Sequence, residues 1–245
     1  MRLLVLSDLH VEFCLFHVPD PDLYDLVILA GDVHTKGRSA AWACEHFQKP
    51  VVMVAGNHEL YGSSWNKAFS RLASDATGHV HFLEQRSVVI GGVRFVGCAA
   101  WTDFEMTGNF PLAMLDAQSQ MNDYKQIRLE PGYQRITPQF IRRQAQRSRE
   151  WLFNEISKPH SGKTIVITHH PPLMQFVPDY GQHPHLSAAY GNEWQEFLSL
   201  GIDLWVFGHT HWPVDEVVNG IRFISNPRGY PSEDLEFNSE LVVQI

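Results

Sequence analysis

Five short polar segments of this chain carry side chains of the types that bind metal ions. They combine aspartate, asparagine and histidine, which suit Mn, Fe or Zn ions. The segments are Asp8-Leu9-His10, Gly31-Asp32, Gly56-Asn57-His58-Glu59, His169-His170 and Gly208-His209-Thr210-His211. Two aspartates, one asparagine and at least four histidines outline a dinuclear metal site. Such a site would hold two metal ions about 3.5–4 Å apart.

Each polar segment directly follows a short apolar run that predicts a buried strand. The runs are rich in Val, Ile and Leu and cover residues 3–6, 26–30, 51–55, 164–167 and 204–207. In layered α/β proteins, ligands bind outside the carboxyl ends of the strands. We therefore expect the five segments to meet at one edge of a sheet.

Helix and hairpin signals complete the expected fold. Helices are predicted at 39–47, 64–74, 138–156 and 192–200, the third with Thr137 as its N-cap. Hairpin turns are predicted at Gly91-Gly92 and Asn219-Gly220. Strand–helix alternation early in the chain and hairpins later predict an α/β (α+β) protein. Its expected architecture is a four-layer sandwich of two mixed β-sheets flanked by helices.

The chain is expected to form a single domain over residues 1–245, because no change of composition resembles a linker. Two segments, 102–137 and 173–191, contain Pro and Gly and match no regular element. Both follow predicted strands that end near the expected site. Loops of this length often cover binding sites, so we interpret both as lid-like insertions.

Spacing suggests how the ligands could converge. Asp8 and His10 are two residues apart, and so are His209 and His211. Residues two apart on extended backbone face the same side, so both members of each pair can reach one site. The short carboxylate of Asp32 could bridge two metals about 3.5–4 Å apart.

Two further segments leave some roles open. The amide oxygen of Asn57 can coordinate a metal without adding charge, and His58 beside it can face the substrate instead. Glu59 could orient His58 or cap the next helix. Adjacent residues on extended backbone point in opposite directions, so one of His169 and His170 is expected to coordinate, and His169 is the choice.

In this order, the five segments resemble those of the calcineurin-like metallophosphoesterases, and they span residues 8 to 211. The resemblance implies a β-sandwich flanked by helices and a catalytic role for His58. It implies one metal held by Asp8, His10, Asp32 and His211, and a second held by Asp32, Asn57, His169 and His209, with Asp32 as the bridge.

The implied activity is hydrolysis of phosphoric esters with two divalent or trivalent metal ions, Mn, Fe or Zn. A hydroxide that bridges the metals would attack phosphorus in line, and His58 would protonate the leaving oxygen. Asp32 would serve catalysis by holding both metals. Some members of this fold have lost ligands and act as scaffolds for protein assembly. All ligand positions are filled here, which favours the enzyme.

The substrate is expected to be a small-molecule phosphomonoester or phosphodiester. Serine/threonine protein phosphatases carry Gly-Asp-x-x-Asp-Arg-Gly, whereas residues 31–37 here read Gly-Asp-Val-His-Thr-Lys-Gly. Ala55 stands where those enzymes have arginine, so that activity is disfavoured. Arg228, Asp103 and Tyr124 are the candidate substrate-binding residues. Arg228 could instead be a solvent-facing turn residue.

Charge and composition narrow the partners. The formal net charge of -8 disfavours an extended nucleic-acid surface, and hence a nuclease. No apolar run approaches the roughly 20 residues needed to cross a bilayer. Three cysteines without a Cys-x-x-Cys spacing favour a reducing compartment, so a cytoplasmic protein is expected. The oligomeric state is left open.

Overall fold

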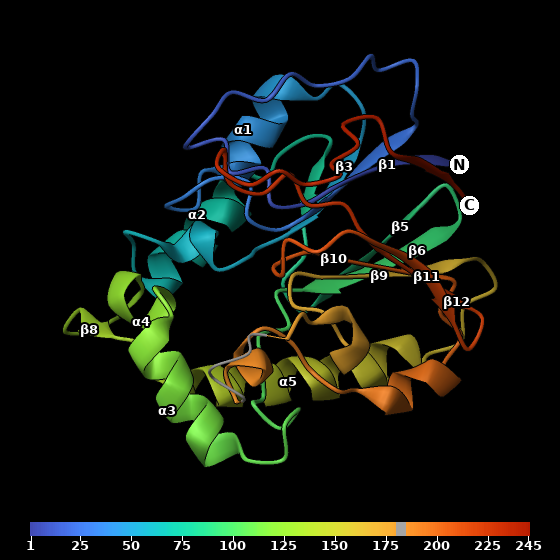
Figure 1. The fold of residues 1–245 in the computed structure, drawn as a ribbon. Helices are drawn as coiled ribbons and strands as arrows, with labels where there is room; N and C mark the ends of the chain where they lie inside the picture. Colours follow the sequence, from blue (N-terminus) through green and yellow to red (C-terminus); the bar gives the residue numbers. More distant parts are fainter. Residues whose placement is uncertain (180–184) are drawn as a thin grey trace.

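The computed structural model describes residues 1–179 and 185–245, which fold into two facing sheets with helices on the outside (Figure 1). The first sheet contains β1 (Arg2–Leu6), β2 (Leu26–Ala30), β3 (Val51–Val54), β4 (Val80–Phe82) and β13 (Val242–Gln244). The second contains β5 (Arg86–Ile90), β6 (Val93–Cys98), β9 (Thr164–Thr168), β10 (Leu204–Phe207), β11 (Val214–Val218) and β12 (Ile221–Ser225).

Both sheets are mixed, as expected. The first has the order β13-β1-β2-β3-β4, with β1 to β4 parallel and β13 antiparallel to β1. The second has the order β11-β12-β10-β9-β6-β5, in which the four central strands are parallel and each edge strand is antiparallel to its neighbour. The five polar segments follow strands that are parallel within each sheet. Because these strands are parallel, their carboxyl ends lie at the same edge of that sheet.

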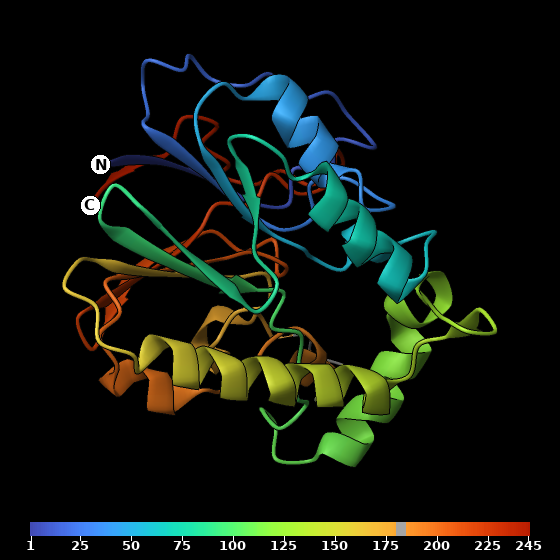
Figure 2. The ribbon, with the colours of Figure 1, turned by 180° about the vertical axis from the view of Figure 1, so that it is seen from behind.

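Alternating side chains along the strands fill both faces of each sheet. Leu3 and Val5 of β1 pack between the sheets, whereas Leu4 and Leu6 pack on the side of α1 (Ser39–His46) and α2 (Trp65–Asp75). The outer face of the second sheet packs against α5 (Pro138–Ile156), which Figure 2 shows running along it. The Thr137 side chain accepts a hydrogen bond from the Phe140 N–H, which confirms the expected N-cap.

The expectation of an irregular segment over 102–137 is wrong. This insertion contains α3 (Phe110–Gln120), α4 (Asp123–Gln126) and the short strands β7 (Arg128–Leu129) and β8 (Gln134–Arg135). Asn109 caps α3 by accepting a hydrogen bond from the Leu112 N–H. Pro111 therefore lies in the first turn, where proline starts a helix rather than ending one.

The prediction of a helix at 192–200 is also wrong, because this segment forms only a 3₁₀ turn, η4 (Gln195–Ser199). Trp194 and Phe197 are both buried, and their spacing of three residues suits a 3₁₀ turn. The other 3₁₀ turns of the described residues are η1 (His58–Leu60), η2 (Met174–Phe176) and η3 (Leu186–Ala189).

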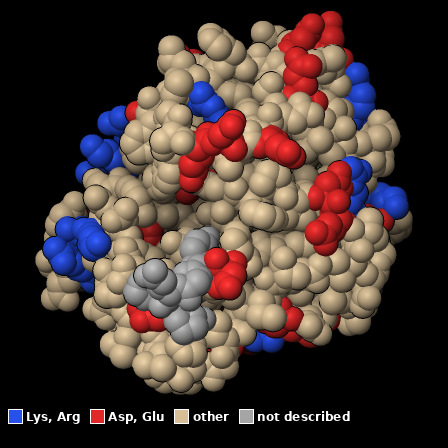
Figure 3. All heavy atoms as spheres, in the orientation of Figure 1, with Lys and Arg blue, Asp and Glu red and all other residues tan. Residues whose placement is uncertain are grey.

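Two surface properties bear on possible partners. None of the helices in the described part of the chain has the length and apolar character needed to cross a bilayer. On the face drawn in Figure 3, Lys and Arg side chains lie near the edges, whereas several Asp and Glu side chains lie nearer the middle. That face lacks the basic surface expected of a protein that binds long nucleic acids.

Candidate metal centre

The loops after β1, β2, β3, β9 and β10 bring the expected ligands together. Three sets of side chains place ligand atoms within 4.8 Å of one another: Asp8, His10 and His211; His10, Asp32 and His58; and Asp32, His169 and His209. Asn57 joins the last set, with its Oδ1 atom 3.1 Å from His169 Nε2. We call Asp8, His10 and His211 the first ligand group, and Asp32, Asn57, His169 and His209 the second.

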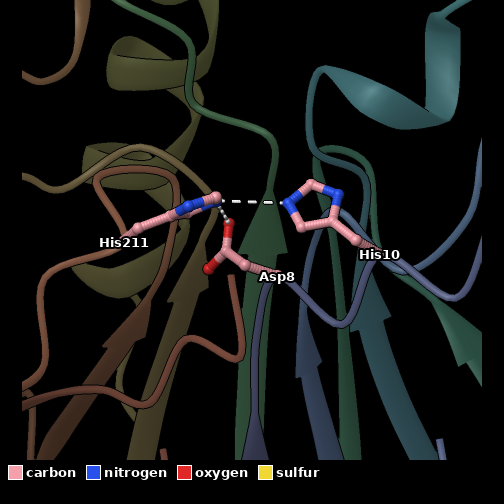
Figure 4. A group of neighbouring side chains, drawn as sticks. All are labelled: Asp8, His10 and His211. Carbon is pink, nitrogen blue, oxygen red and sulfur yellow. Dashed lines mark hydrogen bonds and ion pairs between the residues drawn. The ribbon is translucent and has the colours of Figure 1, made fainter. Parts of the chain in front are cut away.

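The first ligand group joins the loops after β1 and β10. Figure 4 shows the His10 and His211 rings approaching each other above the Asp8 carboxylate. The two Nε2 atoms are 3.2 Å apart, and His211 Nε2 lies 3.6 Å from Asp8 Oδ1. The His209 N–H donates to that same Oδ1, whereas the buried Oδ2 of Asp8 has no hydrogen-bond partner among the described residues.

A carboxylate lies near the Nδ1 atom of each histidine of the first group. His211 Nδ1 lies 2.6 Å from Glu233 Oε2, so its proton lies on Nδ1 and its Nε2 is available to a metal. His10 Nδ1 lies 3.5 Å from Glu12 Oε1. Glu12 and Glu233 both lie outside the five polar segments of the sequence. Only their contacts in the folded chain identify them.

The second ligand group is supported by the backbone of the first sheet. His169 Nδ1 lies 2.8 Å from the Ala30 carbonyl oxygen, which leaves Nε2 facing Asp32 Oδ1 at 3.5 Å. The adjacent His170 instead packs its ring on His209, with the ring centroids 4.0 Å apart. His169 is therefore the one of the adjacent pair that faces the other ligands.

Two residues fix the orientation of Asn57. Its Nδ2 donates to Asp123 Oδ1 at 3.0 Å and to the Tyr61 hydroxyl oxygen at 3.1 Å, and the Tyr61 hydroxyl donates to the same Asp123 oxygen. The amide nitrogen is thus held away from the centre, and Oδ1 faces His169. Asp123 belongs to α4, so the insertion at 102–137 directly supports a candidate metal ligand.

The ligands converge for a different reason than strand alternation. Asp8, His10, Asp32, His209 and His211 all have left-handed backbone, with φ between 44° and 71°. The expected extended geometry of the i, i+2 pairs is therefore wrong. Left-handed backbone is costly for residues other than glycine, and it is concentrated at functional sites.

Close approach explains two glycines of the segments. A Cβ atom at Gly56 would lie 2.1 Å from Asp32 Oδ1, and one at Gly208 would lie 2.4 Å from Asp8 Oδ2. Any larger side chain would push a carboxylate out of place. The glycines are therefore part of what shapes both ligand groups.

Glu59 has neither of the roles considered from the sequence. Its fully buried carboxylate accepts hydrogen bonds from the N–H groups of Asp32, Val33 and Gly56 and from the Ser39 hydroxyl. It ties the loop after β2 to the loop after β3. Each of these loops contributes one ligand to the second group.

His58 lies between a carboxylate and a tyrosine. Its Nδ1 is 3.0 Å from Glu12 Oε1, and its Nε2 is 3.0 Å from the Tyr230 hydroxyl oxygen. The backbone N–H of His58 donates to Asp32 Oδ1. Burial alone would lower the pKa of His58, but the charge of Asp32 and the hydrogen bond to Glu12 outweigh burial and raise it to about 8. Although burial opposes charge on Glu12, its contacts with the His10 and His58 rings lower its pKa to about 2.

The donors fit a pair of metal ions. Burial would lower the pKa of His169, yet the charge of Asp32 and its contact with the ring raise it to about 10, so this point of the structure favours positive charge. Asp8 Oδ2 and His209 Nε2 are buried without a hydrogen-bond partner in the described chain. Because buried polar atoms are normally paired, carboxylate and imidazole atoms left in this way suit metal coordination.

A cavity of about 300 Å³ opens beside the ligands. Metal ligands, aromatic residues and the insertion line it: Asp32, Asn57, Tyr61, Gln120, Met121, Asn122, Asp123, Tyr190, His209, Thr210, His211, Tyr230 and Glu233. Sequence reasoning placed Tyr124 at the substrate, but the cavity is lined by its neighbours in the chain, Asn122 and Asp123.

The expected substrate-binding residues already have other contacts. The Arg228 guanidinium donates to the carbonyl oxygens of Leu9, Cys14 and Leu15. Asp103 Oδ2 accepts a hydrogen bond from Trp194 Nε1, and Tyr124 is buried in the core of the insertion. These positions favour a structural role, and substrate contact by the three residues stays a prediction.

Three comparisons place the chain among known proteins. The profile of the calcineurin-like phosphoesterase family matches residues 1–213. An uncharacterized protein of Acanthamoeba polyphaga mimivirus is 23% identical over 282 aligned positions, covering 100% of this chain and 97% of the viral protein. A crystal structure of phosphopantetheinyl hydrolase from Mycobacterium tuberculosis superposes with a TM-score of 0.71 and 19% identity, covering 94% of this chain and 90% of the other. That structure shares the fold.

Proposed function

The chain belongs to the calcineurin-like phosphoesterase family, and we propose that it hydrolyses small-molecule phosphoric esters with two metal ions. One observation carries the proposal. Seven ligand side chains of the expected types meet in two groups, and Asp32 lies within reach of ligands of both. In the family sequence pattern this aspartate bridges the metals.

Each ion would have its own set of protein ligands. Asp8, His10, Asp32 and His211 would hold one ion, and Asp32, Asn57, His169 and His209 would hold the other. When bound, two such ions supply positive charge for the phosphoryl oxygens and make a water molecule more acidic. Mixed sets of imidazole, carboxylate and amide ligands accept several metals, so Mn, Fe and Zn all remain in the proposal.

His58 is the proposed source of the proton for the leaving oxygen. The Glu12 carboxylate holds the ring through Nδ1, which directs Nε2 away from Glu12. In the absence of metal, burial lowers the pKa of His58, but the charge of Asp32 and the hydrogen bond to Glu12 outweigh burial and raise it to about 8. The contact with Glu12 favours the protonated imidazole that a general acid requires. Among the residues of the site, His58 thus combines a held position with an available proton.

The cavity supports a small substrate with an uncharged or cationic organic group. Its volume of about 300 Å³ suits a small molecule. The charged residues among its described lining are Asp32, Asp123 and Glu233, with histidines but no Lys or Arg. A second phosphate group outside the metal centre would therefore meet no fixed cation.

The test is reconstitution of the metal-free protein with Mn, Fe, Zn or Ni, followed by rates on phosphomonoesters and phosphodiesters. A phosphopantetheinyl ester belongs among the diesters because a hydrolase of that name shares the fold. We expect two ions per chain by elemental analysis and hydrolysis of at least one ester class.

Paired variants make this test specific. Asp32→Asn should lose bound metal and activity together, whereas Asp215→Asn, which breaks an exposed ion pair with Arg222, should lose neither. A folded protein that binds two ions and hydrolyses no ester would contradict the proposal and favour a scaffold.

A further inference from the structure

The histidine assigned to the leaving group does not line the cavity. His58 is 4% exposed, and the cavity lining includes Tyr230 in its place. The Tyr230 hydroxyl oxygen lies 3.0 Å from His58 Nε2, and Tyr230 itself lines the cavity. A substrate in the cavity would therefore meet the tyrosine hydroxyl first.

The other ring nitrogen offers no alternative route. A carboxylate accepts hydrogen bonds, so Glu12 at 3.0 Å from Nδ1 places a proton on that atom. Only Nε2 is left to exchange a proton with the substrate, and Tyr230 occupies it. Hydroxyl groups both donate and accept, so Tyr230 can receive a proton from Nε2 while giving its own away.

Tyr230 is also held firmly in this position. Its N–H donates to Glu233 Oε2 at 2.7 Å, and the N–H of the preceding Gly229 donates to the Asp8 carbonyl oxygen at 3.0 Å. Its ring centroid lies 4.6 Å from that of His10 and 4.9 Å from that of His211. Contacts with the loops after β1 and β10 therefore hold Tyr230 at the edge of the candidate metal centre.

We propose that Tyr230 is a further catalytic residue, which relays the proton from His58 to the leaving oxygen. This inference rests on the proposed ester hydrolysis. As a hydroxide oxygen bonds to phosphorus and the P–O bond to the leaving group breaks, the electron pair of the broken bond stays on the leaving oxygen, which takes the Tyr230 hydroxyl proton. Tyr230 takes the proton of His58 Nε2 in the same step, so an alcohol forms and the imidazole becomes neutral. Tyr230 lies beyond residues 1–213, which the family profile matches.

The experiment compares Tyr230→Phe, His58→Gln and the double variant on two esters of the metal-loaded protein. An alkyl phosphate ester needs a proton on its leaving oxygen, whereas a 4-nitrophenyl ester does not. General acid catalysis contributes roughly 10²- to 10⁴-fold, so each variant should slow the alkyl ester by about a hundredfold or more. The 4-nitrophenyl ester should change by less than about threefold, since its leaving group needs no such help.

If both residues act in one relay, the double variant should be no slower than His58→Gln alone. Tyr61→Phe is the matched control, because it removes a hydroxyl that lines the same cavity but bonds Asp123 instead of His58. Any effect of that variant should be equal for the two esters. Thermal unfolding and metal content check that every variant is folded and loaded.

Full activity of Tyr230→Phe on the alkyl ester would overturn the relay. An equal loss on both esters would overturn it as well, because a purely structural role predicts no dependence on the leaving group. Wild-type protein that hydrolyses neither ester would instead disprove the proposed function.

Discussion

The two ligand groups are built on different kinds of support. In the second group, His169 is held by a carbonyl oxygen of the first sheet and Asn57 by the buried carboxylate of Asp123. In the first group, His211 is held by Glu233, whose side chain is 35% exposed. The second group thus depends on a sheet carbonyl and a buried carboxylate, whereas His211 of the first group depends on a carboxylate that water can reach.

This difference suggests unequal metal sites. Partners that hold a ligand's second atom fix its orientation, and removing them typically costs ten- to hundredfold in metal affinity or activity. A buried partner in a rigid element loses less entropy when the metal binds than an exposed, flexible one. We therefore expect the second ligand group to bind its ion more tightly.

The largest effect should come from removing one ligand of each group. His169→Ala should abolish the tighter of two binding steps in calorimetric metal titration, and His211→Ala should abolish the weaker step. Either loss should lower kcat by about a thousandfold or more, because a bound metal supplies several kcal/mol to the transition state.

His170→Ala provides the control for that comparison, since His170 is buried beside His169 but packs on the His209 ring instead of facing Asp32. It should retain both binding steps. Loss of the tighter step in His211→Ala would reverse the proposed order of the sites.

The convergence of the candidate ligands was predictable from the sequence, whereas the residues that support them were not. Short apolar runs identify buried strands, and the polar residue after each run then falls at the sheet edge, as with Asp32 after β2. Asp123 and Glu233 follow no strand-like run, and each meets its ligand only through the folded chain. Asp123 also lies in the insertion at 102–137, whose helices the sequence pattern does not indicate, because a proline such as Pro111 can begin a helix as well as end one.

A smaller effect should follow from removing these supports. Asp123→Ala should weaken the tighter binding step, and Glu233→Ala the weaker one, each by roughly ten- to hundredfold. The titration is the same as for the ligand variants. Asp123→Asn should lose less than Asp123→Ala, because its amide oxygen can still accept from Asn57 and Tyr61. Equal weakening of both steps by either alanine variant would show that the supports are not separate.

The local backbone was not predictable either. A sequence pattern indicates that Asp8 and His10 follow a strand, but the left-handed conformation of both residues depends on neighbouring loops. The Asp8 N–H donates to the Gly31 carbonyl oxygen and the His10 N–H to the Asp32 carbonyl oxygen. These contacts join loops more than twenty residues apart, so no local pattern of residues records them.

Glu84 should give the smallest effect on the metal centre and sharpens the comparison from outside both groups. The buried carboxylates of the ligand groups face imidazoles, whereas Glu84 accepts a hydrogen bond from the Ala99 N–H, and burial raises its pKa to about 7. Because this folded-state pKa lies above the ordinary value of 4.5, the neutral carboxyl stabilises the fold fully below pH 4.5. That contribution is lost as the pH rises through about 7.

Glu84→Gln stays neutral, so relative to wild type it should be more stable at pH 8 than at pH 5, by about 1 kcal/mol and at most about 3. Urea unfolding of the metal-free proteins at the two pH values measures this, and metal titration should show both binding steps unchanged. An equal stability difference at pH 5 and pH 8 would mean that Glu84 is already ionised in the folded protein at pH 5.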